Sequence, residues 1–268
     1  MFITFWPSGS VFSPSLTSRQ HQTAFIRSSP LSLCRQSLPP HRLRLRAQVF
    51  SAAAPTSFES FFRCQTGQWH TLRCYFYRRA AAAEGEPPVL ESERSETTFS
   101  VAPLTLSTKR AVLRDNGVDE RALTEAGLDL EGGIAGFCVT FATVMERGER
   151  VKESTNLLFV PDIAGRGDGT SGTAVRGKYY RDRGYEEGGP IAAEFEYRPD
   201  ERELLMITAY AKTVSVDRIT LCNEQLRLRQ ITNYRRPLQW DPSRSAHLNR
   251  PLLQDVWLNG GGIEQKVA

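Results

Sequence analysis

The sequence is poor in the residues that metal sites and hydrolytic triads use. Its 268 residues contain five cysteines and four histidines, and no two cysteines form a C-x-x-C pair. After residue 57 only His70 and His247 remain, whereas zinc sites and Ser/His/Asp triads usually draw on histidine. We therefore expect no metal site and no such triad, and we expect the cysteines to be reduced. No run approaches the ~20 apolar residues that a membrane helix needs, so no membrane span is expected.

Acidic residues are absent from the first 58 positions, which changes the meaning of the net charge of +4. That charge alone would suggest nucleic acid or an anionic membrane as a partner. However, the acid-free segment holds six of the 34 basic residues, which leaves 28 basic against 30 acidic residues in the rest of the chain. The remainder is mildly acidic, and a nucleic-acid partner is not expected.

The same N-terminal segment has no lysine and is rich in serine, proline and arginine. A composition that is Arg-rich, Ser-rich and acid-free is typical of an organelle transit peptide, and a plain disordered extension is the alternative. We predict that residues 1–57 are a plastid-targeting or disordered extension. A small-residue run at 51–54 is the candidate region for cleavage.

Short strand-like segments dominate the rest of the chain, with turn residues between them at intervals of ~8–12 residues. They are residues 67–77, 97–106, 136–145, 151–160, 172–180, 190–197, 203–210, 214–221 and 226–234. Residues 57–62 predict a helical turn, and residues 109–130 are helix-like. The pattern predicts an all-β fold, an antiparallel barrel of about ten strands with one helical excursion and room for a small ligand. We place this domain at 58–258 and expect residues 259–268 to be a flexible C-terminal tail.

Two arginines at alternate positions of a late strand are the main candidate for a binding site. Arg227 and Arg229 share one face of the strand, about 6–7 Å apart at ~3.3 Å per residue. If that face points outward, this is an ordinary charged surface strand. If it points inward, the two guanidinium groups suit a ligand with two carboxylates, and Asp217 could accept hydrogen bonds from the same ligand. The periodicity leaves both readings open.

Several motifs resemble a known family, the S/U-type phycobiliprotein chromophore lyases, which transfer linear tetrapyrroles (bilins) to antenna apoproteins. The Gly67-x-Trp69 motif is typical of lipocalin-like barrels. The resemblance rests on the ordered series at 61–62, 67–73, 181–185, 190–197, 204–210, 217–219 and 226–229. It implies a lipocalin-like, calycin-type antiparallel barrel.

The resemblance also implies roles for individual residues. Asp217 stands where the family usually has a glutamate that contacts the pyrrole nitrogens, and it is the implied catalytic residue. The implied bilin-binding residues are Arg73, Phe141, Arg227, Arg229 and Asp255. Phe141 stands where the family often has tryptophan.

The resemblance implies a plastid enzyme that binds phycoerythrobilin or phycocyanobilin as substrate and has no prosthetic group. It would promote thioether attachment of the bilin to a cysteine of a phycobiliprotein apo-subunit, with the beta subunit preferred. The alternative is a non-catalytic lipocalin-like carrier or chaperone for a bilin or another apolar acid. Whether the protein forms a homodimer is left open.

Overall fold

The computed structural model describes the chain outside residues 1–56, 80–87, 163–173, 185–187, 237–254 and 268. The predicted N-terminal extension at 1–57 therefore lies almost wholly outside the described residues. His247 and most of the connection that leads into the last strand also lie outside them.

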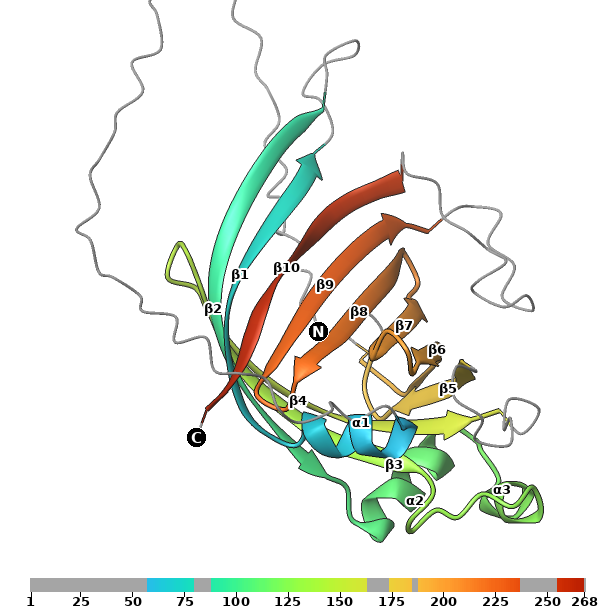
Figure 1. Ribbon diagram of the computed structural model, residues 1–268. Helices are drawn as coiled ribbons and strands as arrows, with labels where there is room; N and C mark the ends of the chain where they lie inside the picture. Colours follow the sequence, from blue (N-terminus) through green and yellow to red (C-terminus); the bar gives the residue numbers. More distant parts are fainter. Residues whose placement is uncertain (1–56, 80–87, 163–173, 185–187, 237–254, 268) are drawn as a thin grey trace, which may run out of the picture. The chain divides into compact units, whose positions relative to one another are not determined.

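Ten strands form one closed antiparallel barrel in the order β1-β10-β9-β8-β7-β6-β5-β4-β3-β2 (Figure 1). Strands β2 to β10 follow one another around the wall, and β1 closes the ring between β2 and β10. The strands are β1 Gly67–Arg79, β2 Val89–Pro103, β3 Ala135–Met145, β4 Arg150–Pro161, β5 Val175–Arg181, β6 Ile191–Arg198, β7 Glu203–Ala209, β8 Thr213–Asn223, β9 Leu226–Arg235 and β10 Val256–Val267. The predicted all-β barrel of about ten strands is confirmed.

Side chains alternate strictly between the two faces of β1. Trp69, Thr71, Arg73 and Tyr75 are buried on the inner face, while Leu72 is 68% exposed on the outer face. This alternation follows from the pleat of a strand, in which successive side chains point to opposite faces. The aromatic and polar residues at alternate positions of β1 therefore belong to the barrel interior.

A short helix, α1 Phe58–Gln65, lies across one end of the barrel (Figure 1). It begins where the Ser57 hydroxyl accepts a hydrogen bond from the Ser60 N–H, a standard N-cap. Phe61 and Phe62 are almost completely buried and join the aromatic core inside the barrel. The helix therefore forms the floor of the barrel interior, and the predicted helical turn is confirmed.

Two further helices, α2 Leu106–Asp115 and α3 Glu120–Glu125, follow β2, and α2 contacts the outside of β4 and β5. The predicted helical excursion at 109–130 is confirmed, with its break at Asn116 and Gly117. Gly117 has φ +68°, a left-handed conformation that glycine adopts without strain. The buried Lys109 ammonium donates to the carbonyl oxygens of Leu130, Glu131 and Ile134 and so fastens α2 to the next loop.

The prediction of a flexible tail at 259–268 is wrong for the residues that the structure describes. Strand β10 runs to Val267 and pairs with both β1 and β9. The run Gly260–Gly262 obscures the strand pattern, but it is needed for close approach. A Cβ atom at Gly261 would lie 2.1 Å from the backbone oxygen of Arg229, and one at Gly260 would lie 2.3 Å from the Tyr75 ring. The domain therefore extends beyond 258.

Candidate functional site

The barrel encloses a cavity with aromatic and aliphatic walls and a few polar groups. Its apolar lining includes Phe62, Phe99, Phe137, Phe159, Leu204 and Met206. Its polar and charged lining includes Gln65, Thr155, Arg181, Thr208, Asp217, Arg227, Arg229 and Asn233. An apolar cavity with a small number of directed polar groups is the usual form of a small-molecule site.

Strand β9 turns its two arginines inward. The side chains of Arg227 and Arg229 are 3% and 9% exposed, whereas Leu228 between them is 45% exposed on the outer face. The outward reading, which the periodicity left open, is therefore wrong. Because alternate residues share a face, the pair belongs to the cavity wall.

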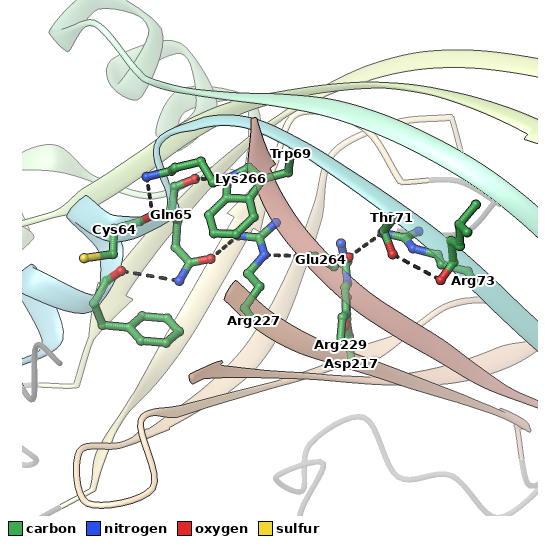
Figure 2. Close-up of polar contacts among 12 residues, drawn as sticks. Cys64, Gln65, Trp69, Thr71, Arg73, Asp217, Arg227, Arg229, Glu264 and Lys266 are labelled. Atoms are coloured by element: carbon green, nitrogen blue, oxygen red, sulfur yellow. Dashed lines mark hydrogen bonds and ion pairs between the residues drawn. The ribbon is translucent and has the colours of Figure 1, made fainter. Parts of the chain in front are cut away.

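A buried carboxylate on β10 joins two arginines from different strands (Figure 2). Glu264 is fully buried and accepts from Arg73 Nη2 at 2.7 Å and from Arg227 Nε at 2.6 Å. Burial alone would raise the pKa of Glu264, but the guanidinium groups of Arg227 and Arg73 dominate and lower it to about 2. The carboxylate is therefore ionised at any physiological pH.

The Arg227 guanidinium is held on several sides. Its Nη1 donates to Gln65 Oε1 on α1, and its centre lies 4.0 Å from the Trp69 ring centroid and 4.9 Å from that of Phe99. Burial lowers the pKa of Arg227, and its contact with Glu264 opposes that effect. Cation–π contact and the ion pair together fix this side chain at the floor of the cavity.

Arg229 binds Asp217 on the neighbouring strand through two hydrogen bonds. Nε donates to Oδ1 at 2.9 Å, and Nη2 donates to Oδ2. Burial by itself would raise the pKa of Asp217, but the adjacent Arg229 charge holds it well below its usual range. Asp217 is thus a permanent hydrogen-bond acceptor that faces the cavity.

We refer to Arg73, Asp217, Arg227, Arg229 and Glu264 as the arginine cluster. It contains three guanidinium groups and two carboxylates, and all five side chains are buried or nearly so. Charge-assisted hydrogen bonds are the strong ones in a protein interior, so the cluster holds Arg227, Arg229 and Asp217 in fixed positions on the cavity wall.

The structure places the other predicted residues less directly. Arg73 lies behind Glu264 in the arginine cluster, and Phe141 is buried in the aromatic core. Asp255 directly precedes β10. In the described part of the chain none of these three is among the residues that line the cavity.

Sequence reasoning missed two charged residues of the interior. Glu264 fell in the supposed tail, although alternation with Gly262 and Lys266 on β10 places it on the inner face. Arg181, on β5, was part of the family series but received no role. Its position two residues after Tyr179, which is buried in the core, was the available signal.

A closed ten-stranded antiparallel barrel around such a cavity defines a lipocalin-like ligand-binding protein. The chain belongs to the CpeS-like protein family, whose family model matches residues 57–239. A curated relative, chromophore lyase CpcS/CpeS 1 of Synechococcus sp. (strain JA-3-3Ab), is 40% identical over 210 residues, which are 78% of this chain and 96% of the relative.

A solved structure supports the fold independently. The S-type phycobiliprotein lyase CPES from Guillardia theta matches with a TM-score of 0.52 and 15% identity, over 79% of this chain and 93% of that chain. At that identity the likeness concerns the fold alone. Across the described ranges no helix has the length and apolar character to cross a membrane, and no three His, Cys, Asp or Glu side chains gather as metal ligands.

Proposed function

We propose that this protein is a phycobiliprotein chromophore lyase that binds a linear tetrapyrrole in its barrel and promotes thioether attachment to a cysteine of a phycobiliprotein subunit. The observation that carries the proposal is the inward-facing pair Arg227 and Arg229 in a chain of the CpeS-like family. A relative that matches over nearly its whole length is itself named a chromophore lyase, which supports the proposal.

The chemistry of the arginine cluster suits a bilin. A bilin carries two propionates, and guanidinium groups bind carboxylates through paired N–H donors. Ionised Asp217 can accept hydrogen bonds from pyrrole N–H groups and favours the protonated, cationic form of the bilin. That form makes the A-ring ethylidene more electrophilic.

Bond formation would then be an addition. The thiolate of the acceptor subunit adds to the ethylidene carbon, a C–S bond replaces the exocyclic π bond, and the tetrapyrrole takes up a proton. The nucleophile belongs to the acceptor, so none of Cys64, Cys74, Cys138 and Cys222 is required. The barrel contributes orientation and exclusion of water.

The rival proposal is a carrier that holds a bilin without promoting transfer. We propose the beta subunit as the acceptor. In the test, purified protein is incubated with phycoerythrobilin or phycocyanobilin and with apo-alpha or apo-beta subunits. Acid-stable coloured subunit that forms faster and more cleanly than without the protein supports the lyase. Bilin binding without any gain in transfer rate or purity would establish the carrier.

The pocket assignment has its own test. Arg229→Met combined with Asp217→Asn removes both partners, so no buried charge is left unpaired. We expect bilin affinity, measured by the change in absorbance on titration, to weaken by about 10-fold or more. The reason is that a charged hydrogen bond contributes ~1.5–3 kcal/mol. Arg218→Met on the outer face of β8, where the side chain is 47% exposed, is the control. Equal affinity in both variants, with the circular dichroism of the wild type, contradicts the assignment.

Location and assembly remain proposals. We propose that residues 1–57 direct the protein to the plastid, on the support of their acid-free, Arg- and Ser-rich composition. A fluorescent protein fused behind these residues should accumulate in plastids, and diffuse cytosolic fluorescence would contradict this. Sedimentation velocity would decide whether a homodimer forms.

A further inference from the structure

A further buried guanidinium lines the cavity, on a part of the wall away from the arginine cluster. Arg181, at the end of β5, is 5% exposed and lines the same cavity as Arg229. Three strands, β6, β7 and β8, separate β5 from β9 on one side of the ring, and five separate them on the other. The two arginines therefore come from separate parts of the barrel wall and line one cavity.

Hydroxyl groups of three residues lie near the Arg181 guanidinium. Its Nη1 donates to Tyr210 Oη at 2.8 Å, just after β7, and the neighbouring Tyr179 hydroxyl contacts that of Thr208. Burial raises the pKa of Tyr179, so its phenol is neutral at physiological pH. This part of the wall thus presents a guanidinium with phenol and hydroxyl groups, which is the chemistry of an anion site.

The backbone of Arg181 is fixed in place. Asn116, the C-cap of α2, donates from Nδ2 to the Arg181 carbonyl oxygen at 3.0 Å and to that of Val112 at 2.9 Å. One amide thus joins the end of the outer helix to the end of β5. A backbone that is already ordered adds no entropy cost of its own when a ligand binds.

In the arginine cluster, the guanidinium groups that line the cavity are hydrogen-bonded to carboxylates of the protein. Arg227 and Arg229 are each bonded to a buried carboxylate, which occupies two of the donors of Arg229 and one of Arg227. Arg227 gives another donor to Gln65 and is covered by the Trp69 ring. Because these donors are already in use, Arg227 and Arg229 have few N–H groups left for ligand carboxylates. A ligand with two carboxylates would therefore bind more tightly if a further arginine held the second one.

We propose that Arg181 binds a second carboxylate of the ligand, so that a dicarboxylic tetrapyrrole is held by one acid group at each of these two parts of the barrel wall. This inference rests on the proposed function and refines it. A second anchor would restrict the position of the tetrapyrrole inside the barrel. Arg181 would therefore act as a positioning residue for attachment.

The test compares a diacid with its diester. The full chain is titrated with biliverdin and with biliverdin dimethyl ester, and binding is followed by the change in absorbance. We expect Arg181→Met to weaken diacid binding by about 10- to 100-fold, because it removes one charged hydrogen-bonding group, and to leave ester binding unchanged. Arg181→Lys should recover much of the preference for the diacid.

Arg176→Met is the matched control, because Arg176 lies on the same strand with its side chain 64% exposed and paired with Glu196 on the outer face. It should bind both probes like the wild type. Equal loss of diacid and ester binding in Arg181→Met would assign Arg181 a structural role and overturn the inference, as would unchanged diacid binding. If Arg181→Met does not fold, the same comparison with Arg181→Gln decides.

Failure of the proposed function gives a different result. If the wild-type protein binds neither probe nor phycoerythrobilin, the tetrapyrrole site itself is refuted and the inference falls with it. If the wild type binds the diacid but does not discriminate against the ester, the site stands and the second carboxylate anchor is refuted.

Discussion

Glu264→Gln tests whether the buried carboxylate on β10 organises the barrel interior. The side chain is fully buried and accepts at 2.7 and 2.6 Å from Arg73 and Arg227. Glutamine has nearly the same shape but no charge, so the substitution leaves two buried guanidinium groups without their anion. Breaking a buried ion pair on one side costs ~3–5 kcal/mol, a large part of the ~5–15 kcal/mol that stabilises a typical domain.

The pKa of Glu264 gives a second measure of the same effect. A pKa lowered from 4.5 to about 2 on folding corresponds to about 3 kcal/mol of stability. Because the folded-state pKa is the lower one, this contribution is complete above pH 4.5 and is lost as the pH falls toward 2. Since glutamine does not titrate, Glu264→Gln should flatten the acid limb of the stability profile.

Urea unfolding at pH 7 and at several pH values down to 3, followed by tryptophan fluorescence, measures both effects. Trp69 reports directly, since the Arg227 guanidinium lies 4.0 Å from its ring centroid. The control is Glu96→Gln, whose exposed carboxylate pairs with His70 on the outer face and should contribute less than about 1 kcal/mol. If Glu264→Gln lowers the free energy of unfolding no more than Glu96→Gln, the reasoning is refuted.

Two further predictions concern β10 and α2. Gly261→Ala places a Cβ atom 2.1 Å from the backbone oxygen of Arg229, so we expect the free energy of unfolding, measured by thermal unfolding, to fall by about 1–3 kcal/mol. The control Gly189→Ala, whose Cβ would have no atom within 4 Å, should be neutral. Equal stability of the two variants would contradict the close approach. Lys109→Met leaves three carbonyl oxygens without their shared ammonium donor and should cost about 2–3 kcal/mol, with faster amide exchange in α2 measured by hydrogen exchange. Unchanged exchange in α2 would show that Lys109 does not fasten the helix.

The barrel was predictable because alternation and turn spacing are local properties of the sequence. On β1 the buried face contains the aromatic residues Trp69 and Tyr75, so alternation and burial coincide there. On β9 the same pattern could not decide which face is buried, because Arg227 and Arg229 alternate with Leu226 and Leu228 and the polar face is the buried one. The buried position of these arginines depends on the carboxylates that pair with them, Asp217 and Glu264, and both lie on other strands.

The acids of the site illustrate the same limit. Asp217 could be placed because it lies on the strand adjacent to Arg229, within one hairpin. Glu264 could not, because its partner Arg73 lies on the first strand and the three glycines before it conceal the strand pattern. Close approach of backbones is a property of the assembled barrel, and a local reading of glycine finds flexibility instead.

The closure of the barrel has a consequence for how the chain folds. Strands β2 to β9 pair with neighbours in sequence, but β10 must return to β1, with Val267 opposite Gln68. A contact between such distant residues carries the largest loop-closure entropy in the molecule, so we expect it to form last. Until β10 docks between them, β1 and β9 present open edges that can pair with other chains, and aggregation during refolding should therefore compete with the docking of β10.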